Sequence, residues 1–283
     1  MMAENIIIAN LNNFERIKKE ISKQGKEKLH VLADFDRTLT YSFVNGEEVP
    51  SMISILRKEN YLTPDYSEKA HALFDKYHPI EINPDIPLEK KKKAMLEWWK
   101  SHFDLLIKCG LNKKDLEKAV KSEKIKLREG ASEFFDLLHK NNIPLIILSS
   151  SGLGGDAISM CLKYKGELYD NMHIVSNSYI WDKNGNAKGI KEPIIHSMNK
   201  AEISIKNYPI YKEVKNRKNV LLLGDNIEDL GMIEGFDYNH LIKLGFLNQD
   251  IEINLRSYKK NFDVVLLNDS DMRYASKLLK ELI

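Results

Sequence analysis

The sequence is poor in cysteine, with only Cys109 and Cys161 among its 283 residues. A disulfide framework is therefore excluded, and so few cysteines favour a reducing compartment. Apolar runs of the roughly 20 residues that a membrane-spanning helix needs are also lacking. The N-terminus has none of the basic start, apolar stretch and small-residue cleavage site that mark a secretory signal. We therefore expect a soluble, cytoplasmic, globular protein.

A large net charge is missing as well, because 43 Lys and Arg are balanced by 41 Asp and Glu, for a formal net charge of +2. Such a balance provides no general attraction to nucleic acid or to an anionic membrane. The lysine-rich stretch at residues 89–93 has the pattern of a solvated helix face. We expect neither nucleic acid nor a membrane as a partner, and a monomer by default.

Four short apolar segments predict a parallel sheet. Each is too short for a helix, and each is followed by polar or small residues, as in strands buried on both faces. The segments are residues 29–33, 144–148, 220–223 and 264–267. Helical patterning lies between them, as at residues 130–141 and 226–235, and residues 1–28 read as a leading helix. The predicted fold class is α/β, with a Rossmann-like parallel sheet flanked by helices.

An insertion follows the first of these segments. About a hundred residues separate it from the second, far more than an ordinary crossover needs. Helical patterning recurs there at residues 67–77, 88–109 and 113–122, without a strong strand signal. We expect a mainly helical cap domain at residues 44–127, inserted after the first catalytic strand, on a core made of residues 1–43 and 128–283.

The strongest chemical signal is the run from Asp34 to Thr40, which reads DFDRTLT directly after the first apolar segment. Strand alternation places Asp34 and Asp36 on one side, and ligands of open parallel sheets bind outside the carboxyl ends of the strands. Two such carboxylates repel each other unless a cation or a shared proton intervenes. The pattern suits a Mg²⁺ site with a carboxylate nucleophile beside an acid/base. The alternative is a pair of acids that only caps a loop.

A second acidic motif, LGDNIEDL, places Asp225 after the third apolar segment, at the sheet edge expected for Asp34. Hard oxygen ligands from two strand ends suit Mg²⁺, and Asp229, one turn further on, could support them. In isolation, either residue could be a helix cap. The Ser- and Gly-rich loop at 149–156 follows the second segment and offers backbone N–H groups to a phosphate.

A cation is also required on electrostatic grounds. A carboxylate about 4 Å from a phosphate dianion meets several kcal/mol of repulsion at an effective dielectric constant near 20. A lysine would relieve this repulsion and stabilise the transition state. The composition does not select one lysine from the many in the chain.

Together, these ordered motifs resemble the haloacid dehalogenase superfamily of phosphohydrolases. The resemblance is closer to cytosolic 5′-nucleotidase III, the pyrimidine 5′-nucleotidase family, and covers nearly the whole chain after residue 25. The stretches that support it are residues 77–81, 97–102, 175–177, 189–191 and 195–200.

For the core, the resemblance implies that Asp34 is the nucleophile and Asp36 the acid/base. It implies that Mg²⁺ is held by Asp34, the backbone carbonyl of Asp36, and Asp225. It also selects Lys200 as the phosphate-binding, catalytic lysine. Arg37 departs from the family pattern, which usually has a small or apolar residue there, and could add a charge near the phosphate.

For substrate binding, the resemblance implies that Glu81 contacts the nucleobase and that Ser101 is a second substrate contact. The phosphate-binding serine is Ser149 when counted from the strand and Ser150 when the glycine is aligned, and Ser149 is preferred. One of the adjacent Trp98 and Trp99 could stack on a base; the alternative places both in the core.

The expected function is Mg²⁺-dependent hydrolysis of nucleoside 5′-monophosphates, with UMP and CMP as expected substrates, through an aspartyl-phosphate. One alternative is a related phosphatase for another small phosphomonoester, such as a phosphoserine-like compound, a sugar phosphate or 7-methyl-GMP. Another is a receiver-like module in which Asp34 is phosphorylated without turnover, which an acid/base at Asp36 argues against.

Overall fold

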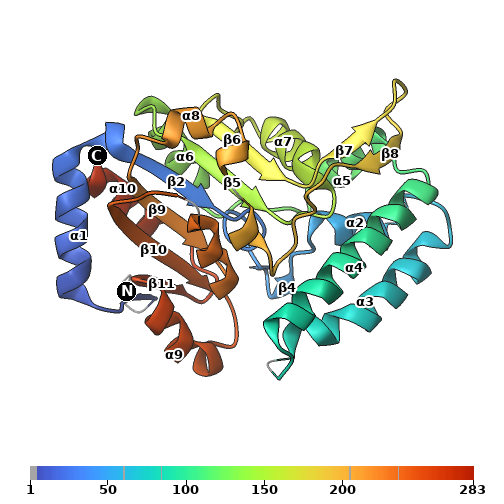
Figure 1. The fold of residues 1–283 in the computed structure, drawn as a ribbon, viewed down its shortest axis with the longest axis horizontal. Helices are drawn as coiled ribbons and strands as arrows, with labels where there is room; N and C mark the ends of the chain where they lie inside the picture. Colours follow the sequence, from blue (N-terminus) through green and yellow to red (C-terminus); the bar gives the residue numbers. More distant parts are fainter. Residues whose placement is uncertain (1–4, 60, 84, 204, 235) are drawn as a thin grey trace.

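The computed structural model describes residues 5–59, 61–83, 85–203, 205–234 and 236–283. A seven-stranded sheet lies at its centre, in the order β1-β11-β10-β9-β2-β5-β6 (Figure 1). Its strands are β1 (Ile6–Ile8), β2 (Leu29–Ala33), β5 (Leu145–Ser149), β6 (Met172–Ser176), β9 (Asn219–Gly224), β10 (His240–Leu247) and β11 (Val264–Leu267). β1 pairs antiparallel with β11, and the other neighbours pair in parallel. The predicted α/β class is confirmed.

Alternation along the central strands builds a core on both faces of the sheet. In β2, Val31 and Ala33 join one hydrophobic cluster, and Leu32 joins the cluster on the opposite face. The first cluster is covered by α1 (Leu11–Gln24), α6 (Ala131–Lys140), α7 (Gly154–Tyr164) and α10 (Arg273–Leu282). The second is covered by η3 (Ile205–Asn207), α8 (Tyr211–Val214), η4 (Ile227–Ile233) and Ile203, which follows the short turn η2 (Lys200–Glu202). Burial on both faces explains the unbroken apolar runs of these strands.

The four predicted strands are present, with ends that differ by one residue at most. β1, β6 and β10 were not predicted. β1 is an apolar run of only three residues and was included in the predicted leading helix, whereas polar residues or glycine interrupt the apolar runs of β6 and β10. The leading helix predicted for residues 1–28 is correct over α1 but wrong over residues 6–8, which form β1. Residues 1–4 of this prediction lie outside the described part of the chain. The helical pattern at 226–235 corresponds to η4, a 3-10 helix, and Gly235 is not among the described residues.

A helical layer lies beyond the carboxyl ends of the strands (Figure 1, right). It contains α2 (Met52–Lys58), α3 (Tyr66–Ile82), α4 (Leu88–Lys108) and α5 (Lys113–Lys121), preceded by the hairpin of β3 (Phe43–Val44) and β4 (Glu47–Glu48). Three of these helices match predicted ones; α2 was missed. A second hairpin, β7 (Tyr179–Trp181) and β8 (Ala187–Ile190), reaches this layer, where the Ala187 N–H donates to the Leu111 carbonyl at 2.8 Å. α9 (Ile251–Asn261) packs near β10 and β11.

The chain enters and leaves the helical layer through two paired segments. The Arg128 N–H donates to the Leu39 carbonyl at 3.0 Å, and the Tyr41 N–H donates to the Lys126 carbonyl at 2.9 Å. Thr40 and Leu127 form a β-bridge between these bonds. The segment that leads into the helical layer, residues 39–43, is the outgoing segment, and residues 126–128 form the returning segment. The two lie side by side where the run of residues 34–40 ends. None of the helices in the described residues combines the length and apolar character needed to cross a lipid bilayer.

A buried histidine makes stability depend on pH. His30 in β2 is 1% exposed, and its Nδ1 lies 2.8 Å from the carbonyl oxygen of Arg217, so this nitrogen carries the proton. Burial lowers the pKa of His30 to about 4, whereas a histidine in an unfolded chain has a pKa of about 6.5. Between these values the unfolded state binds more protons, so stability falls as the pH falls below about 6.5.

Acidification from pH 7 to pH 5 is therefore expected to remove about 2 kcal/mol of stability through His30 alone. Urea unfolding at the two pH values measures the loss. His30→Asn, which retains a donor but does not titrate, should show a pH dependence that is smaller by this amount. An unchanged pH dependence in this variant would assign the loss to other groups.

Candidate active site

Asp34 lies at the carboxyl end of β2, where the neighbouring strand β9 also ends. Its backbone N–H donates to the Leu223 carbonyl at 3.1 Å, which continues the pairing of the two strands. The carboxylate is buried, and the Nζ of Lys200 lies 2.6 Å from its Oδ1. Burial raises the pKa of Asp34; Lys200 opposes this shift, and Asp229 and Asp225 add to it, so the net change is upward. A further cation near Asp34 would offset both burial and the neighbouring carboxylates.

Lys200 opens the short turn η2 and is itself buried. Its ammonium donates to Asp34 and to Asp229, each at 2.6 Å. Burial lowers the pKa of Lys200, but the carboxylates of Asp229 and Asp34 outweigh burial and raise it above its ordinary value. A permanently charged ammonium therefore lies against the predicted nucleophile, at the position expected for a group that binds phosphate.

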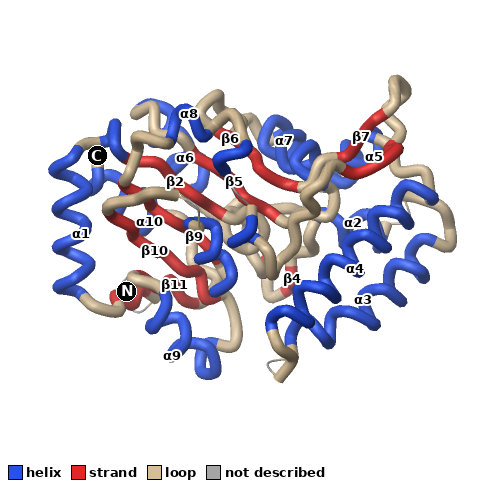
Figure 2. The backbone as a smooth tube through the Cα atoms, viewed as in Figure 1, coloured by secondary structure: helices blue, strands red, loops and turns tan. Residues whose placement is uncertain are grey.

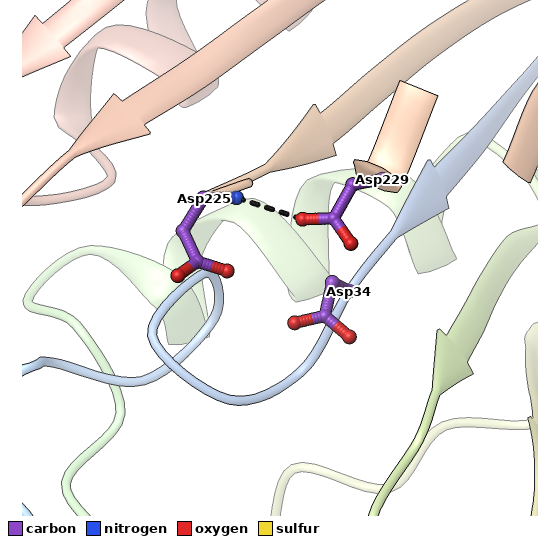
Figure 3. A group of neighbouring side chains, drawn as sticks. All are labelled: Asp34, Asp225 and Asp229. Atoms are coloured by element: carbon purple, nitrogen blue, oxygen red, sulfur yellow. Dashed lines mark hydrogen bonds between the residues drawn. The ribbon is translucent and has the colours of Figure 1, made fainter. Parts of the chain in front are cut away.

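Asp225 and Asp229 come from the end of β9 and from η4, and their carboxylates converge on that of Asp34 (Figure 3). Oxygens of the three side chains lie within 4.8 Å of one another. Asp229 is fully engaged, because its Oδ1 accepts from Lys200 and its Oδ2 accepts the N–H groups of Asp225 and Asn226, each at 3.0 Å. Asp229 therefore anchors the lysine and the turn, which leaves Asp34 and Asp225 as the freer oxygen donors.

The donor set fits a hard divalent cation. Burial raises the pKa of Asp225 to about 7, and Asp229 adds to this shift, because three clustered carboxylates are opposed mainly by one lysine. Thr38 donates to the Oδ1 of Asp225 at 3.1 Å and so orients it. Oxygen-only coordination by one or two carboxylates is the preference of Mg²⁺, and a cation here would relieve the repulsion among the carboxylates. Asp34 and Asp225 thus fit the predicted metal site.

Asp36, the predicted acid/base, is half-buried in the loop that follows β2. Burial raises its pKa to about 6, and the charges of Arg37 and Lys200 partly oppose the shift. A carboxyl group with a pKa near neutrality can both donate and accept a proton during turnover.

Arg37 has a left-handed backbone, with φ of 62°, and its guanidinium pairs with Glu48 of β4. This pairing ties the Arg37 side chain to the first hairpin of the helical layer.

The loop after β5 carries the two candidate phosphate-binding serines. Ser149 ends β5 and is buried, and its Oγ accepts the N–H of Ser151 at 3.2 Å; Ser150 is half-buried. Both lie at the edge where β2 ends, because β5 pairs in parallel with β2. Sequence reasoning missed the role of Asn177, whose Nδ2 donates to the carbonyls of Ser151 and Ile195. This amide joins the serine loop to the segment that leads to Lys200.

Glu81 reaches from α3 to the core. Its Oε1 accepts a hydrogen bond from the hydroxyl of Ser197 at 2.6 Å, and its Oε2 lies 3.2 Å from Nδ1 of His78. Ser197 is three residues before Lys200, so a carboxylate of the helical layer contacts the segment that leads to the predicted phosphate-binding lysine. Ser101 lies half-buried on α4.

The two tryptophans of α4 have different surroundings. Trp98 stacks against Tyr77 of α3 at a ring distance of 5.9 Å. Trp99 packs onto the serine loop, where a Cβ added to Gly152 would lie 2.8 Å from its ring. Gly152 is therefore required for this close approach, and α4 lies in direct contact with the loop. In Figure 2, loops at the strand ends lie between the sheet and α4.

Comparison with known proteins agrees with this geometry. The family model of the pyrimidine 5′-nucleotidases, UMPH-1, matches residues 37–283. The chain belongs to this family. It is accordingly a phosphomonoester hydrolase of the 5′-nucleotidase class, as the resemblance predicted. Among curated relatives, the 7-methylguanosine phosphate-specific 5′-nucleotidase A of Xenopus laevis is 35% identical over 261 residues, which are 92% of this chain and 89% of that protein.

Solved structures place this 5′-nucleotidase in the same fold group. The crystal structure of cytosolic 5′-nucleotidase IIIB bound to cytidine superposes with a TM-score of 0.90 at 28% identity, over 99% of this chain and 94% of that one. A substrate-bound phosphoserine phosphatase shares the fold alone, with a TM-score of 0.54 at 20% identity over 88% and 96% of the two chains. The predicted haloacid dehalogenase-type architecture is confirmed.

Proposed function

We propose that this 5′-nucleotidase hydrolyses nucleoside 5′-monophosphates to nucleoside and phosphate, with Mg²⁺ and through an aspartyl-phosphate on Asp34. The observation that carries the proposal is the contact of Asp34 with Lys200, beside Asp225, at the carboxyl ends of adjacent strands. A receiver-like module would need no acid/base at Asp36. We also propose a cytoplasmic location, supported by the similarity to a nucleotidase named cytosolic.

In this mechanism Asp34 attacks phosphorus as the bond to the ribose 5′-oxygen breaks, which divides one difficult displacement into two easier ones. Asp36 donates its proton to the departing oxygen. It then removes a proton from water, which attacks the aspartyl-phosphate and releases inorganic phosphate. Lys200 neutralises charge on the transferring group. Asp34, Asp225 and the backbone carbonyl of Asp36 would hold Mg²⁺, which supplies further neutralisation of that charge.

The phosphate group would be bound by the loop after β5. The hydroxyl of Ser149 or Ser150 would contact a phosphate held at the ends of β2 and β5, because β5 pairs in parallel with β2. The N–H groups of Gly154 and Gly155, at the start of α7, donate to the carbonyls of Ser151 and Asn177 instead. Ser149 remains the preferred residue of the two, because it ends the strand itself.

Residues 44–127 are proposed to act as a cap over a core of residues 1–43 and 128–283. The paired segments at 39–41 and 126–128 offer a narrow connection for this movement. Trp99 on Gly152 and Glu81 on Ser197 are contacts that a closed cap makes with the core. Closure would exclude water from the reaction.

For the base, we propose that Glu81 and Ser101 provide polar recognition while an aromatic side chain of α4 stacks on the ring. UMP and CMP are the substrates expected from the family. A second candidate is 7-methyl-GMP, which the aromatic cluster around Trp98 and the carboxylate of Glu81 favour. The methylated base carries a delocalised positive charge, and both an aromatic face and a carboxylate attract a cation.

A panel of phosphate esters tests the function. UMP, CMP, GMP, 7-methyl-GMP, phosphoserine and glucose 6-phosphate are incubated with Mg²⁺, and released phosphate is measured. At least one nucleotide should exceed phosphoserine by about 100-fold in kcat/KM, and chelation should stop the reaction until Mg²⁺ is restored. Preference for phosphoserine or the sugar phosphate would establish the alternative phosphatase. A stable phosphoprotein after one turnover would establish the receiver-like module.

Glu81→Ala is expected to lower kcat/KM for the preferred nucleotide by about 10- to 100-fold, which corresponds to the loss of a charged hydrogen bond. Hydrolysis of p-nitrophenyl phosphate, which has no base, should change less than about threefold. Glu97→Ala is the matched control, because Glu97 is a carboxylate on α4 that accepts from Tyr77. Equal losses with both substrates would show that Glu81 is structural.

A further inference from the structure

Arg128 carries a buried guanidinium at the point where the chain returns from the helical layer. Its side chain is 0% exposed. Every nitrogen of the guanidinium donates a hydrogen bond. The acceptors are the carbonyls of Thr38, Arg37 and Ser270, the Oδ1 of Asp269 and the Oδ1 of Asn248. The fork therefore binds groups from three separate parts of the chain.

Two of these acceptors belong to the loop of residues 34–40, called the catalytic loop here because it carries Asp34 and Asp36. Nε of Arg128 donates to the Thr38 carbonyl at 2.7 Å, and Nη2 donates to the carbonyl of Arg37. Arg37 directly follows Asp36 and has the left-handed backbone that favours glycine, so its peptide needs outside support. Because the Arg37 carbonyl is fixed, the turn that directs Asp36 is fixed with it.

Asn248 closes a triangle around the same carbonyl. Its Nδ2 donates to the Arg37 carbonyl at 3.0 Å, while its Oδ1 accepts from Nη2 of Arg128 at 2.8 Å. The Arg37 carbonyl thus receives two donors that also bind each other. Such mutually bonded groups orient one another more strictly than separate hydrogen bonds would.

Asp269 connects the guanidinium to the outgoing segment of the chain. Its Oδ1 lies 2.8 Å from Nη1 of Arg128, and its carboxylate accepts the N–H groups of Ser42 and Phe43 at 3.0 and 2.8 Å. The backbone N–H of Arg128 in turn binds Leu39. The Arg128 side chain therefore binds the catalytic loop directly and is connected to the outgoing segment through Asp269.

A lysine cannot reproduce this arrangement. The planar guanidinium presents five donors in a fixed fork, whereas an ammonium presents three donors at a single point. The guanidinium also lies over the ring of Phe246, 4.3 Å from its centre, where a strongly hydrated ammonium is less well accommodated.

We propose that Arg128 is a positioning residue for the acid/base step. Together with Asn248, it holds the Asp36 loop so that the acid faces the leaving oxygen, and through Asp269 it ties this orientation to the entry of the helical layer. This inference rests on the proposed function, because it assumes that Asp36 protonates the leaving group.

Leaving-group dependence tests the inference. A nucleotide leaves as a basic ribose oxygen that needs a proton, whereas p-nitrophenolate leaves without one, so loss of acid catalysis affects the two substrates unequally. Arg128→Lys should lower kcat/KM for the preferred nucleotide at least 30-fold and for p-nitrophenyl phosphate less than threefold. Asn248→Leu, which removes the second donor to Arg37 without adding charge, should show the same selectivity with a loss of about 10-fold.

Arg217→Lys is the matched control. Arg217 also donates to three backbone carbonyls, those of Lys26, Leu29 and Asn142, but it does so at the opposite end of β2. Its substitution should change both substrates equally and by less than threefold. If Arg128→Lys does not fold, as judged by urea unfolding, Asn248→Leu decides the outcome.

Equal losses with the two substrates in Arg128→Lys and Asn248→Leu, or no loss, would overturn the inference. Asp36→Asn separates this failure from failure of the proposed mechanism, because it should be the most selective variant of all. If Asp36→Asn is selective and the other two are not, Asp36 is the acid and Arg128 does not position it. If Asp36→Asn is not selective, the proposed role of Asp36 fails, and the inference fails with it.

Discussion

Replacing Asp34 with asparagine is expected to abolish turnover, with a loss of kcat of roughly 10⁴-fold or more. An amide is not a nucleophile toward phosphorus, and the substitution also removes a metal-binding charge. Folding should survive, because the amide oxygen of asparagine can still accept the hydrogen bond of Lys200, and Asp229 continues to pair with the ammonium. Phosphate release from the preferred nucleotide and the thermal unfolding midpoint are the two measurements.

A matched control for this variant is Asp263→Asn. Asp263 is a half-buried carboxylate whose pKa is also raised by burial. It lies just before β11, where it accepts the backbone N–H of Lys243 in β10. It should retain nearly full activity. Residual activity above about 1% in Asp34→Asn, with a normal unfolding midpoint, would show that another group attacks the phosphate.

Replacing Lys200 with methionine is expected to have the second largest effect. Its ammonium lies 2.6 Å from both Asp34 and Asp229, and all three side chains are buried. Removal of one partner from a buried ion pair costs about 3–5 kcal/mol, because the remaining charges lose their compensation. Loss of a donor to the transferring group should also lower kcat by roughly 10²- to 10³-fold.

Urea unfolding in the presence of a chelator measures the stability loss without compensation by added metal. Lys218→Met provides the comparison, because the pair formed by Lys218 and Asp237 is exposed, and such surface pairs contribute at most about 1 kcal/mol. An unfolding free energy of Lys200→Met within about 1 kcal/mol of the parent protein would contradict the compensating role assigned to this lysine.

The apolar pattern of the strands, together with the rule that parallel strands end at one edge of a sheet, was sufficient to predict that the two acidic motifs lie close together. Asp34 and Asp225 each follow a strand that is buried on both faces, and β2 and β9 are direct neighbours. Their carboxylates therefore meet because parallel strands end at one edge. The same logic placed Ser149 and Ser150 at that edge, since β5 pairs with β2.

The periodicity of the sequence could not identify Lys200 as a site residue. Only the family resemblance selected it among the lysines of the chain. It begins a 3-10 turn of three residues, without a repeating apolar pattern to show where the side chain points. Its position depends on Asp229, which lies 29 residues further along the chain. The hairpin of β7 and β8 was missed for a related reason, because strands this short carry little alternation.

The amino-acid order by itself determined the α/β class, the place of the acidic motifs at strand ends, and a long helical segment after the first of them. These features follow from burial of apolar side chains at regular intervals, which is a local property of the chain. Only the tertiary structure decided which side chains support the acids. Arg128 and Asp269 are 141 residues apart in the sequence. The residues that neighbour Arg128 in the chain do not predict which distant groups its buried guanidinium binds.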